Sequence, residues 1–219
     1  MSARRSRGIA FLSATVLVSA PFLSYEALAA PAGTFATLTP AELTKVVSDP
    51  TLAPSGVTID STYVQDLGVR EGLLCYTADW KPVTIAPAHM VWRALQGPQV
   101  GGAIRILQYP TQKAAAASMK AMVAAQCPNG ANPKTPLTQV KTTLPVKNGA
   151  PGVAVTSTMI DDGAFETHDA AYRQIGKAIV EVSILSPGKA NAAISSAIHP
   201  QLPVLADRAV QAYRAAASR

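Results

Sequence analysis

The 219-residue sequence contains few charged, aromatic and cysteine residues. Asp, Glu, Lys and Arg make up 15% of the chain, and Phe, Trp and Tyr make up 5%. Disordered chains combine high charge with low hydrophobicity, so the 48% of hydrophobic residues excludes that class. The presence of only two cysteines excludes a disulfide-dense miniprotein and a four-cysteine zinc site. The composition therefore predicts a globular domain that is long enough to bury a substantial core.

Positive charge exceeds negative charge, but it is not clustered. The chain has 19 Lys and Arg against 13 Asp and Glu, a net charge of +6. Beyond the N-terminal segment the basic residues are scattered singly along the sequence. Nucleic-acid binding requires a basic stripe with aromatic platforms for the bases. We therefore expect no nucleic-acid partner and a mildly basic, solvated surface.

The first 30 residues contain the three parts of a secretory signal peptide. A basic region holds Arg4, Arg5 and Arg7, and an uncharged apolar run follows at residues 9–20. Small residues occupy both positions that a signal peptidase recognises, Ala27 and Ala29. We predict cleavage between Ala29 and Ala30.

The alternative to a cleaved signal is a membrane anchor, but a spanning helix needs about 20 apolar residues. The N-terminal apolar stretch is interrupted by Pro21 and Glu26. Cleavage removes three arginines and one glutamate, which lowers the net charge from +6 to +4. The predicted organisation is a signal peptide at residues 1–29, a flexible leader at 30–38 and one domain at 39–219. The mature protein is expected to be secreted, with no stable membrane span.

The two cysteines, Cys75 and Cys127, are predicted to form a disulfide, because export leads to an oxidising compartment. The bridge would close a loop of about 52 residues, which is worth roughly 4 kcal/mol on the chain-entropy model. The alternative is a nucleophilic or metal-binding thiol. Neither cysteine lies in a Cys-x-x-Cys motif or beside a histidine, so we favour the disulfide.

Local signals predict four helical segments. Thr39, Pro40 and Glu42 provide an N-cap, a proline at the first helical position and the third-position glutamate of a capping box. This helix is expected to end near Ser48. Thr111 can cap an alanine-rich helix running from Gln112 to about Gln126. Further helices are predicted at residues 189–198 and 203–217.

Short apolar or alternating runs predict strands. Residues 73–76, 89–95 and 103–109 are expected to form buried strands. A meander follows at 138–146, 152–160, 165–175 and 177–185, with turn signals at Asn148-Gly149, Asp161-Asp162-Gly163 and Gly176. The order of elements predicts a single α+β domain, in which an antiparallel sheet with a C-terminal meander carries helices mainly on one face.

The last predicted strand alternates along its length. Ala178, Val180, Val182 and Ile184 point to one face, which the C-terminal helices are expected to cover through Ile194, Ile198, Val210 and Tyr213. The opposite face carries Lys177, Glu181 and Ser183. We predict that this second face is the wetter one.

Catalytic and metal-binding motifs are scarce. The three histidines, His89, His168 and His199, form no metal-binding motif, and no Gly-x-Ser-x-Gly sequence is present. We therefore expect no metal and no cofactor. Glu166 and His168 share a strand face and could form an acid/base pair. Exposed strand residues without a catalytic role are the more common explanation for such a pair.

Three further residues are candidates for ligand binding. Trp80 and Trp92 stand out in a chain so poor in aromatics, and with Tyr76 and Tyr109 they could line a ligand cleft. Arg105 could reach the same cleft. Core packing is the more common role of a tryptophan, so both alternatives remain open.

Two segments carry a resemblance to a known family. The first is RILQYPTQKAAAASM at residues 105–119, which is followed by Cys127, and the second is YRQIGKAIVEVSI at residues 172–184, before the C-terminal helix. In order and pattern they resemble the PknH-like extracellular sensor domains of actinobacteria, over roughly residues 40–217. In that family the segments form strands and a hairpin of an antiparallel sheet with helices packed against it. This sequence has one cysteine pair, whereas the family's kinase members have two.

The resemblance implies a stand-alone secreted sensing or binding module, and not an enzyme. Our leading hypothesis is an exported, non-catalytic domain that binds an unknown small-molecule or cell-envelope ligand in a cleft between sheet and helices. The alternatives are an envelope hydrolase that uses Glu166 and His168, and a protein–protein interaction module.

Overall fold

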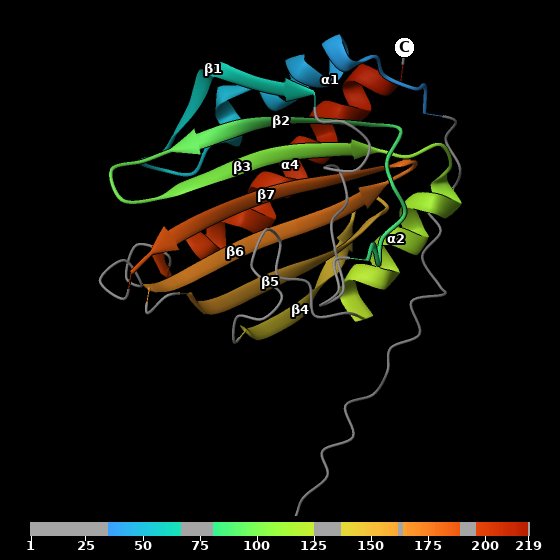
Figure 1. Ribbon diagram of the computed structural model, residues 1–219. Helices are drawn as coiled ribbons and strands as arrows, with labels where there is room; N and C mark the ends of the chain where they lie inside the picture. Colours follow the sequence, from blue (N-terminus) through green and yellow to red (C-terminus); the bar gives the residue numbers. More distant parts are fainter. Residues whose placement is uncertain (1–34, 67–80, 125–136, 162–163, 189–195, 219) are drawn as a thin grey trace, which may run out of the picture.

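The computed structural model describes residues 35–66, 81–124, 137–161, 164–188 and 196–218. These residues form a single seven-stranded antiparallel sheet with three α-helices, in one domain (Figure 1). The α+β fold class is therefore confirmed. The strands are β1 (Thr58–Asp66), β2 (His89–Gln96), β3 (Gly101–Gln108), β4 (Leu137–Lys147), β5 (Ala150–Asp161), β6 (Ala164–Ile175) and β7 (Ala178–Pro187). The helices are α1 (Pro40–Val47), α2 (Gln112–Ala124) and α4 (Leu202–Ala217), with short 3-10 turns η2 (Pro50–Leu52) and η4 (His199–Gln201).

The sheet joins two meanders. Its strand order is β1-β2-β3-β7-β6-β5-β4, and β3 pairs with β7 in antiparallel register. The predicted C-terminal meander is confirmed. Its first turn has two consecutive residues with positive φ, Asn148 at 53° and Gly149 at 67°, as a tight type I′ hairpin requires. Gly176, with φ of 52°, occupies the β6–β7 turn.

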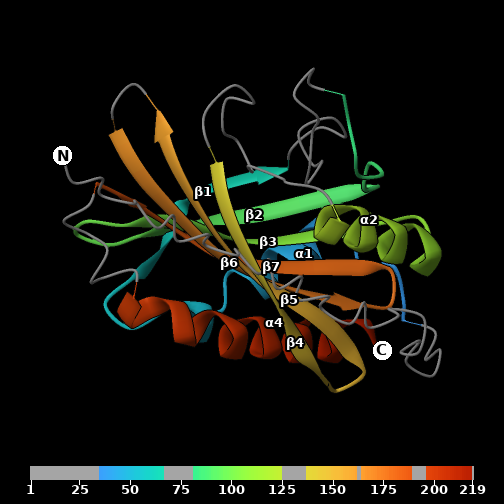
Figure 2. The same cartoon turned by 90° about the horizontal axis from the view of Figure 1, so that it is seen from below.

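The helices lie on both faces of the sheet, with most of the helical material on one. Helices α1 and α4 cover one face and α2 lies on the other (Figures 1 and 2). The predicted capping box of α1 is present: the Glu42 N–H donates to Thr39 Oγ1, and the Thr39 N–H donates to Glu42 Oε2 at 2.9 Å. The predicted cap of α2 is also present, because the Ala114 N–H donates to Thr111 Oγ1 at 3.1 Å.

Two hydrophobic clusters correspond to the two faces. The larger one, between the sheet and α1 and α4, includes the predicted set Ala178, Val180, Val182 and Ile184 together with Ile198, Val210 and Tyr213. The smaller one lies between the sheet and α2, where the helix buries Met119 and Met122.

Residues 35–38, predicted as part of a flexible leader, lie against the domain. Buried Gln108 donates to the Leu38 carbonyl and accepts from the Leu38 N–H, at 2.9 and 3.0 Å. The Ala36 N–H donates to the Ala217 carbonyl at 3.0 Å. These bonds attach the segment to both β3 and the end of α4.

The prediction of a wetter second face is wrong. Glu181 and Ser183 are buried, with 0% and 2% of their surface exposed, and Ile179, which lies between Lys177 and Glu181 on that face, belongs to the α2-side cluster. The predicted alternation of polar and apolar residues is present, but the polar side chains are buried on the α2 side of the sheet. An ion pair with Arg105 compensates the buried charge of Glu181.

Several predictions lie outside the described residues. These are the signal peptide with its cleavage site at Ala29 and Ala30, the strand at 73–76, the Cys75–Cys127 disulfide, Tyr76, Trp80, the turn residues Asp162 and Gly163, and most of the helix at 189–198, including Ile194. No helix in the described ranges is both long and apolar enough to span a membrane. Strand β1 was not predicted from the sequence.

Candidate functional site

Two of the predicted binding residues lie side by side on the α2 face of the sheet. Strand register places Trp92 of β2 opposite Arg105 of β3, Arg105 opposite Glu181 of β7, and Glu181 opposite Tyr172 of β6. The four residues therefore form one continuous row across four strands. We call this set the polar row. Sequence reasoning identified Trp92 and Arg105, but it did not identify their partner Glu181.

A buried ion pair forms the centre of the polar row. Arg105 Nη2 lies 2.8 Å from Glu181 Oε1, and the side chains are 19% and 0% exposed. A buried carboxylate requires a nearby positive charge, and the guanidinium supplies it. Trp92 and Tyr172 flank the pair and pack into the α2-side cluster. The polar row thus combines charge pairing with core packing.

The proposed acid/base residues, Glu166 and His168, lie on the same face of β6, as expected from their spacing. Burial lowers the pKa of His168 below its usual 6.5, and the Arg105 guanidinium adds to this effect, while the Glu181 and Asp169 carboxylates oppose it. The imidazole therefore favours its neutral form. No salt bridge between Glu166 and His168 is found in the described part of the chain.

A cavity of about 480 Å³ lies on the opposite face of the sheet, beside the end of α1. Its walls are largely apolar, with Pro50, Ala53, Val57 and Ile59, and its polar residues are Ser48, Thr58 and Arg93. Arg93 Nε donates to Ser48 Oγ at 2.9 Å, and Ser48 Oγ donates to the Thr44 carbonyl at 2.6 Å. We call this space the Arg93 cavity. It has the size of a small-ligand pocket, about 300–1,000 Å³.

An irregularity in strand pairing lies next to the Arg93 cavity. Ile59 pairs with Leu95, but the next pair along the strands is Val64 with Arg93. Residues 60–63 of β1 therefore lie opposite the single residue Ala94 of β2. Such a bulge bends its strand away from regular pairing. Ile59 and Arg93, one at each end of this irregularity, both line the cavity.

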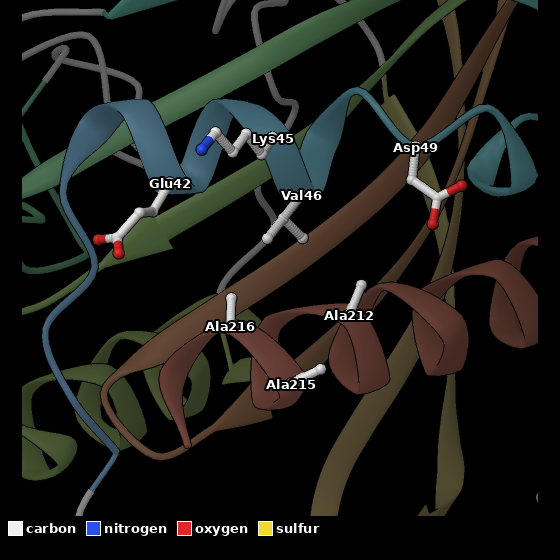
Figure 3. Close-up of a pocket in the computed structure, with 7 residues that line it drawn as sticks. All are labelled: Glu42, Lys45, Val46, Asp49, Ala212, Ala215 and Ala216. Atoms are coloured by element: carbon white, nitrogen blue, oxygen red, sulfur yellow. The ribbon is translucent and has the colours of Figure 1, made fainter. Parts of the chain in front are cut away.

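A smaller groove of about 260 Å³ lies between α1 and α4 (Figure 3). Val46 of α1 points toward Ala212 and Ala216 of α4, and small side chains leave space between the two helices. The charged residues Glu42, Lys45 and Asp49 line the α1 side. Asp49 follows Ser48 directly, so the groove and the Arg93 cavity flank the C-terminal end of α1.

A second polar cluster was not predicted from the sequence. His199 Nδ1 lies 3.0 Å from Asp169 Oδ1, and Thr156 Oγ1 donates to the same oxygen at 2.6 Å. The cluster lies on the α4 face, whereas Glu166 and His168 lie on the other. No sequence motif indicates it, because the three residues are brought together only by strand register and by the return of the chain at η4.

The predicted ligand-binding residues that the structure describes do not line either of the two described cavities. Trp92 and Arg105 lie on the α2 face and line neither the Arg93 cavity nor the α1–α4 groove. Arg93, adjacent to Trp92 in sequence, points to the other side and lines the cavity. Strand alternation could have revealed this, because neighbouring residues of a strand point to opposite faces. No group of three or more potential metal ligands is found among the described residues.

Comparison with known proteins shows a distant likeness to a solved structure. No protein-family model matches the chain, and no curated protein matches it. Among solved structures, the fold is similar to that of the crystal structure of the extracellular domain of PknH from Mycobacterium tuberculosis. The TM-score is 0.44 with 12% sequence identity, and the match covers 80% of this chain and 97% of that chain. The likeness is one of fold alone.

Proposed function

We propose that this protein is a non-catalytic binding domain whose Arg93 cavity holds an amphipathic molecule with an anionic group. The observation that carries this proposal is the cavity itself, of about 480 Å³, in which one guanidinium lies among apolar walls. Apolar walls favour a hydrocarbon body, and a guanidinium favours a carboxylate or phosphate through charge-assisted hydrogen bonds.

The position of Arg93 supports this chemistry. Its Nε is engaged by Ser48, which fixes the direction of the guanidinium relative to the end of α1. A ligand's anionic group would then meet a pre-oriented cation, which reduces the entropy lost on binding. Val57 and Ile59 would contact the apolar part.

The proposal is tested with decanoate as the probe and decan-1-ol as its uncharged counterpart. Titration calorimetry should show decanoate binding, with decan-1-ol binding more weakly. Arg93→Gln should weaken decanoate binding roughly 10- to 100-fold, because a hydrogen bond to a charged group is worth about 1.5–3 kcal/mol. Lys45→Gln, which removes a positive charge from the neighbouring groove, should leave it unchanged.

A second variant keeps the positive charge of Arg93 but fills part of the Arg93 cavity. Ala53→Met adds a flexible apolar side chain to the wall of the cavity and should abolish binding while the protein remains folded by circular dichroism. Equal affinities for Arg93→Gln and Lys45→Gln would contradict the proposal, as would unchanged binding by a folded Ala53→Met variant.

We also propose that the protein is exported and acts outside the cytoplasm, as the signal-like residues 1–29 suggest. Mass spectrometry of the secreted protein should give a chain beginning at Ala30, with Cys75 and Cys127 linked in a non-reduced digest. A secreted chain that retains Met1, or free thiols at both cysteines, would contradict this part of the proposal. The hydrolase based on Glu166 and His168 stays an alternative prediction.

A further inference from the structure

Strand β4 forms one edge of the sheet. It is the last strand in the order β1-β2-β3-β7-β6-β5-β4, so among the described residues it has a neighbouring strand on one side only (Figure 1). Its pairing with β5 is regular from Leu137 to Leu144, and an irregularity occurs only between Leu144 and Lys147. An edge strand directs about half of its backbone N–H and C=O groups away from its one neighbour. This length of regular edge is sufficient to pair with another strand.

The side chains of β4 do not protect this edge in the usual way. Val140 is 61% exposed, the largest exposure among the exposed large hydrophobic residues of the described chain, and Thr142 and Thr143 are also exposed. Natural edge strands commonly carry lysines that discourage pairing. Both lysines of β4 instead contact groups of their own molecule, as described next.

The two lysines of β4 point to partners in their own molecule. Lys141 Nζ donates to the carbonyls of Met122 and Val123 at the end of α2, at 3.2 and 2.9 Å. Lys147 Nζ lies 3.2 Å from Asp207 Oδ2 on α4. The charges are therefore directed toward the two helices, and an incoming strand would meet valine, threonine and leucine side chains.

We propose that β4 pairs with β4 of a second copy of this chain, in antiparallel register, to give one continuous sheet. A two-fold axis at Thr142 would place Val140 opposite Leu144 of the second copy, on the α4 face. Leu144 already packs against the larger core cluster, so Val140 would extend that cluster across the new pair. On the other face Lys141 would lie opposite Thr143, so no like charges face each other.

Strand β1, at the opposite edge of the sheet, is less regular than β4. Strand β1 carries the bulge between Ile59 and Val64, and bulges at a sheet edge discourage pairing. A second copy is therefore expected to join at β4 and not at β1, which limits the assembly to a closed dimer. The Arg93 cavity lies beside β1 and β2, so the dimer and the ligand proposal are independent of each other.

The test is the oligomeric state of the purified protein and of two matched variants. Sedimentation velocity over a series of concentrations should show a monomer–dimer equilibrium for the wild type. Val140→Lys should raise the dimer dissociation constant roughly tenfold or more, because it would place a charged side chain against Leu144 of the second copy. Val204→Lys makes the same change at the 47%-exposed valine of α4 and should leave the equilibrium unchanged.

Circular dichroism and thermal unfolding of each variant show whether it is folded. Thr142→Lys, at a second exposed position of the same edge, replaces Val140→Lys if that variant fails to fold. A wild type that is monomeric at all concentrations would overturn the proposal. So would a dimer that Val140→Lys leaves intact, or one that Val204→Lys weakens equally.

Discussion

At the scale of single residues, Gly152 shows how closely the buried Arg173 side chain approaches the neighbouring strand. The two residues pair across β5 and β6. A Cβ added at Gly152 would lie 2.6 Å from Arg173 Cδ and 2.6 Å from the Tyr172 carbonyl oxygen. Both contacts are well inside van der Waals distance, and one is with backbone that cannot easily move. The absence of a side chain at Gly152 is therefore what allows Arg173 to lie flat across the sheet.

We predict that Gly152→Ala lowers the free energy of unfolding by about 1–3 kcal/mol, the usual cost of overpacking a filled interior. Gly101→Ala is the matched control, because a Cβ there would meet its nearest atom, the Leu95 carbonyl oxygen, only at 4.0 Å. Urea unfolding followed by circular dichroism measures both. Equal stability of the two variants would contradict this account of Gly152.

His168 gives the protein a predicted sensitivity to acid. Its pKa in the folded chain is lowered below 6.5, chiefly by burial. As the pH falls through about 6.5, the unfolded chain therefore binds a proton that the folded chain does not, and the free energy of unfolding decreases. At higher pH both states are neutral at this residue and the effect disappears.

The measurement compares urea unfolding of the wild type and His168→Asn at about pH 7.5 and about pH 5. The wild type should lose more stability between these values than the variant does. If the wild type and the variant lose the same free energy of unfolding, the titration of His168 does not contribute to the pH dependence of stability. That result would contradict this account of His168.

At the scale of elements, Asp207 connects α4 to the sheet through one buried and one exposed ion pair. Its Oδ1 lies 2.8 Å from Arg173 Nε on β6, and both side chains are largely buried. Arg173 Nη1 also donates to the carbonyls of Pro145 and Ala150, at the two sides of the β4–β5 turn. The Lys147 side chain, by contrast, is 57% exposed. The buried guanidinium of Arg173, on strand β6, therefore contacts both helix α4 and the β4–β5 hairpin.

Asp207→Leu should lower the free energy of unfolding by about 3–5 kcal/mol, because it leaves the Arg173 charge buried without its carboxylate. Lys147→Gln removes only the exposed partner and should cost less than about 1 kcal/mol. The double variant Arg173→Met with Asp207→Leu should recover much of the loss, because it removes both charges together. A double variant that is less stable than Asp207→Leu alone would contradict this description.

Elements with local signals were predictable from the sequence. The helix at α1 was expected from Thr39, Pro40 and Glu42, whose side chains and backbone groups bond to each other within one turn. The β4–β5 hairpin was expected from Asn148 and Gly149, because few residue pairs adopt two consecutive positive φ angles. In these cases the determining contacts lie within a few residues.

The rest of the site depends on contacts between distant residues, which no local pattern encodes. The burial of Glu181 depends on α2 and on Arg105 of another strand, so alternation alone suggested a wetter face. Strand β1 is interrupted by its bulge and lacks a clean alternation. The Arg93 cavity depends on the placement of α1, η2 and β1 around one residue of β2. Trp92 was therefore identified from the sequence, whereas its neighbour Arg93 was not.

At the scale of the whole molecule, the sheet separates helix α2 on one side from helices α1 and α4 on the other (Figure 2). The α2 side buries the polar row, whose charges are paired internally. The side of α1 and α4 holds the Arg93 cavity, whose lining combines the Arg93 guanidinium with apolar side chains. We therefore propose that the ligand binds on the second side and that the polar row supports the structure of the first.

The most direct test of this assignment is an NMR titration of the isotope-labelled protein with decanoate. The account predicts that backbone amide shifts change at residues 48–59 and around Arg93, while the indole N–H of Trp92 and the amides around Arg105 and Glu181 stay constant. Changes centred on Trp92, Arg105 and Glu181, with none at residues 48–59, would contradict it and assign the ligand to the other side of the sheet.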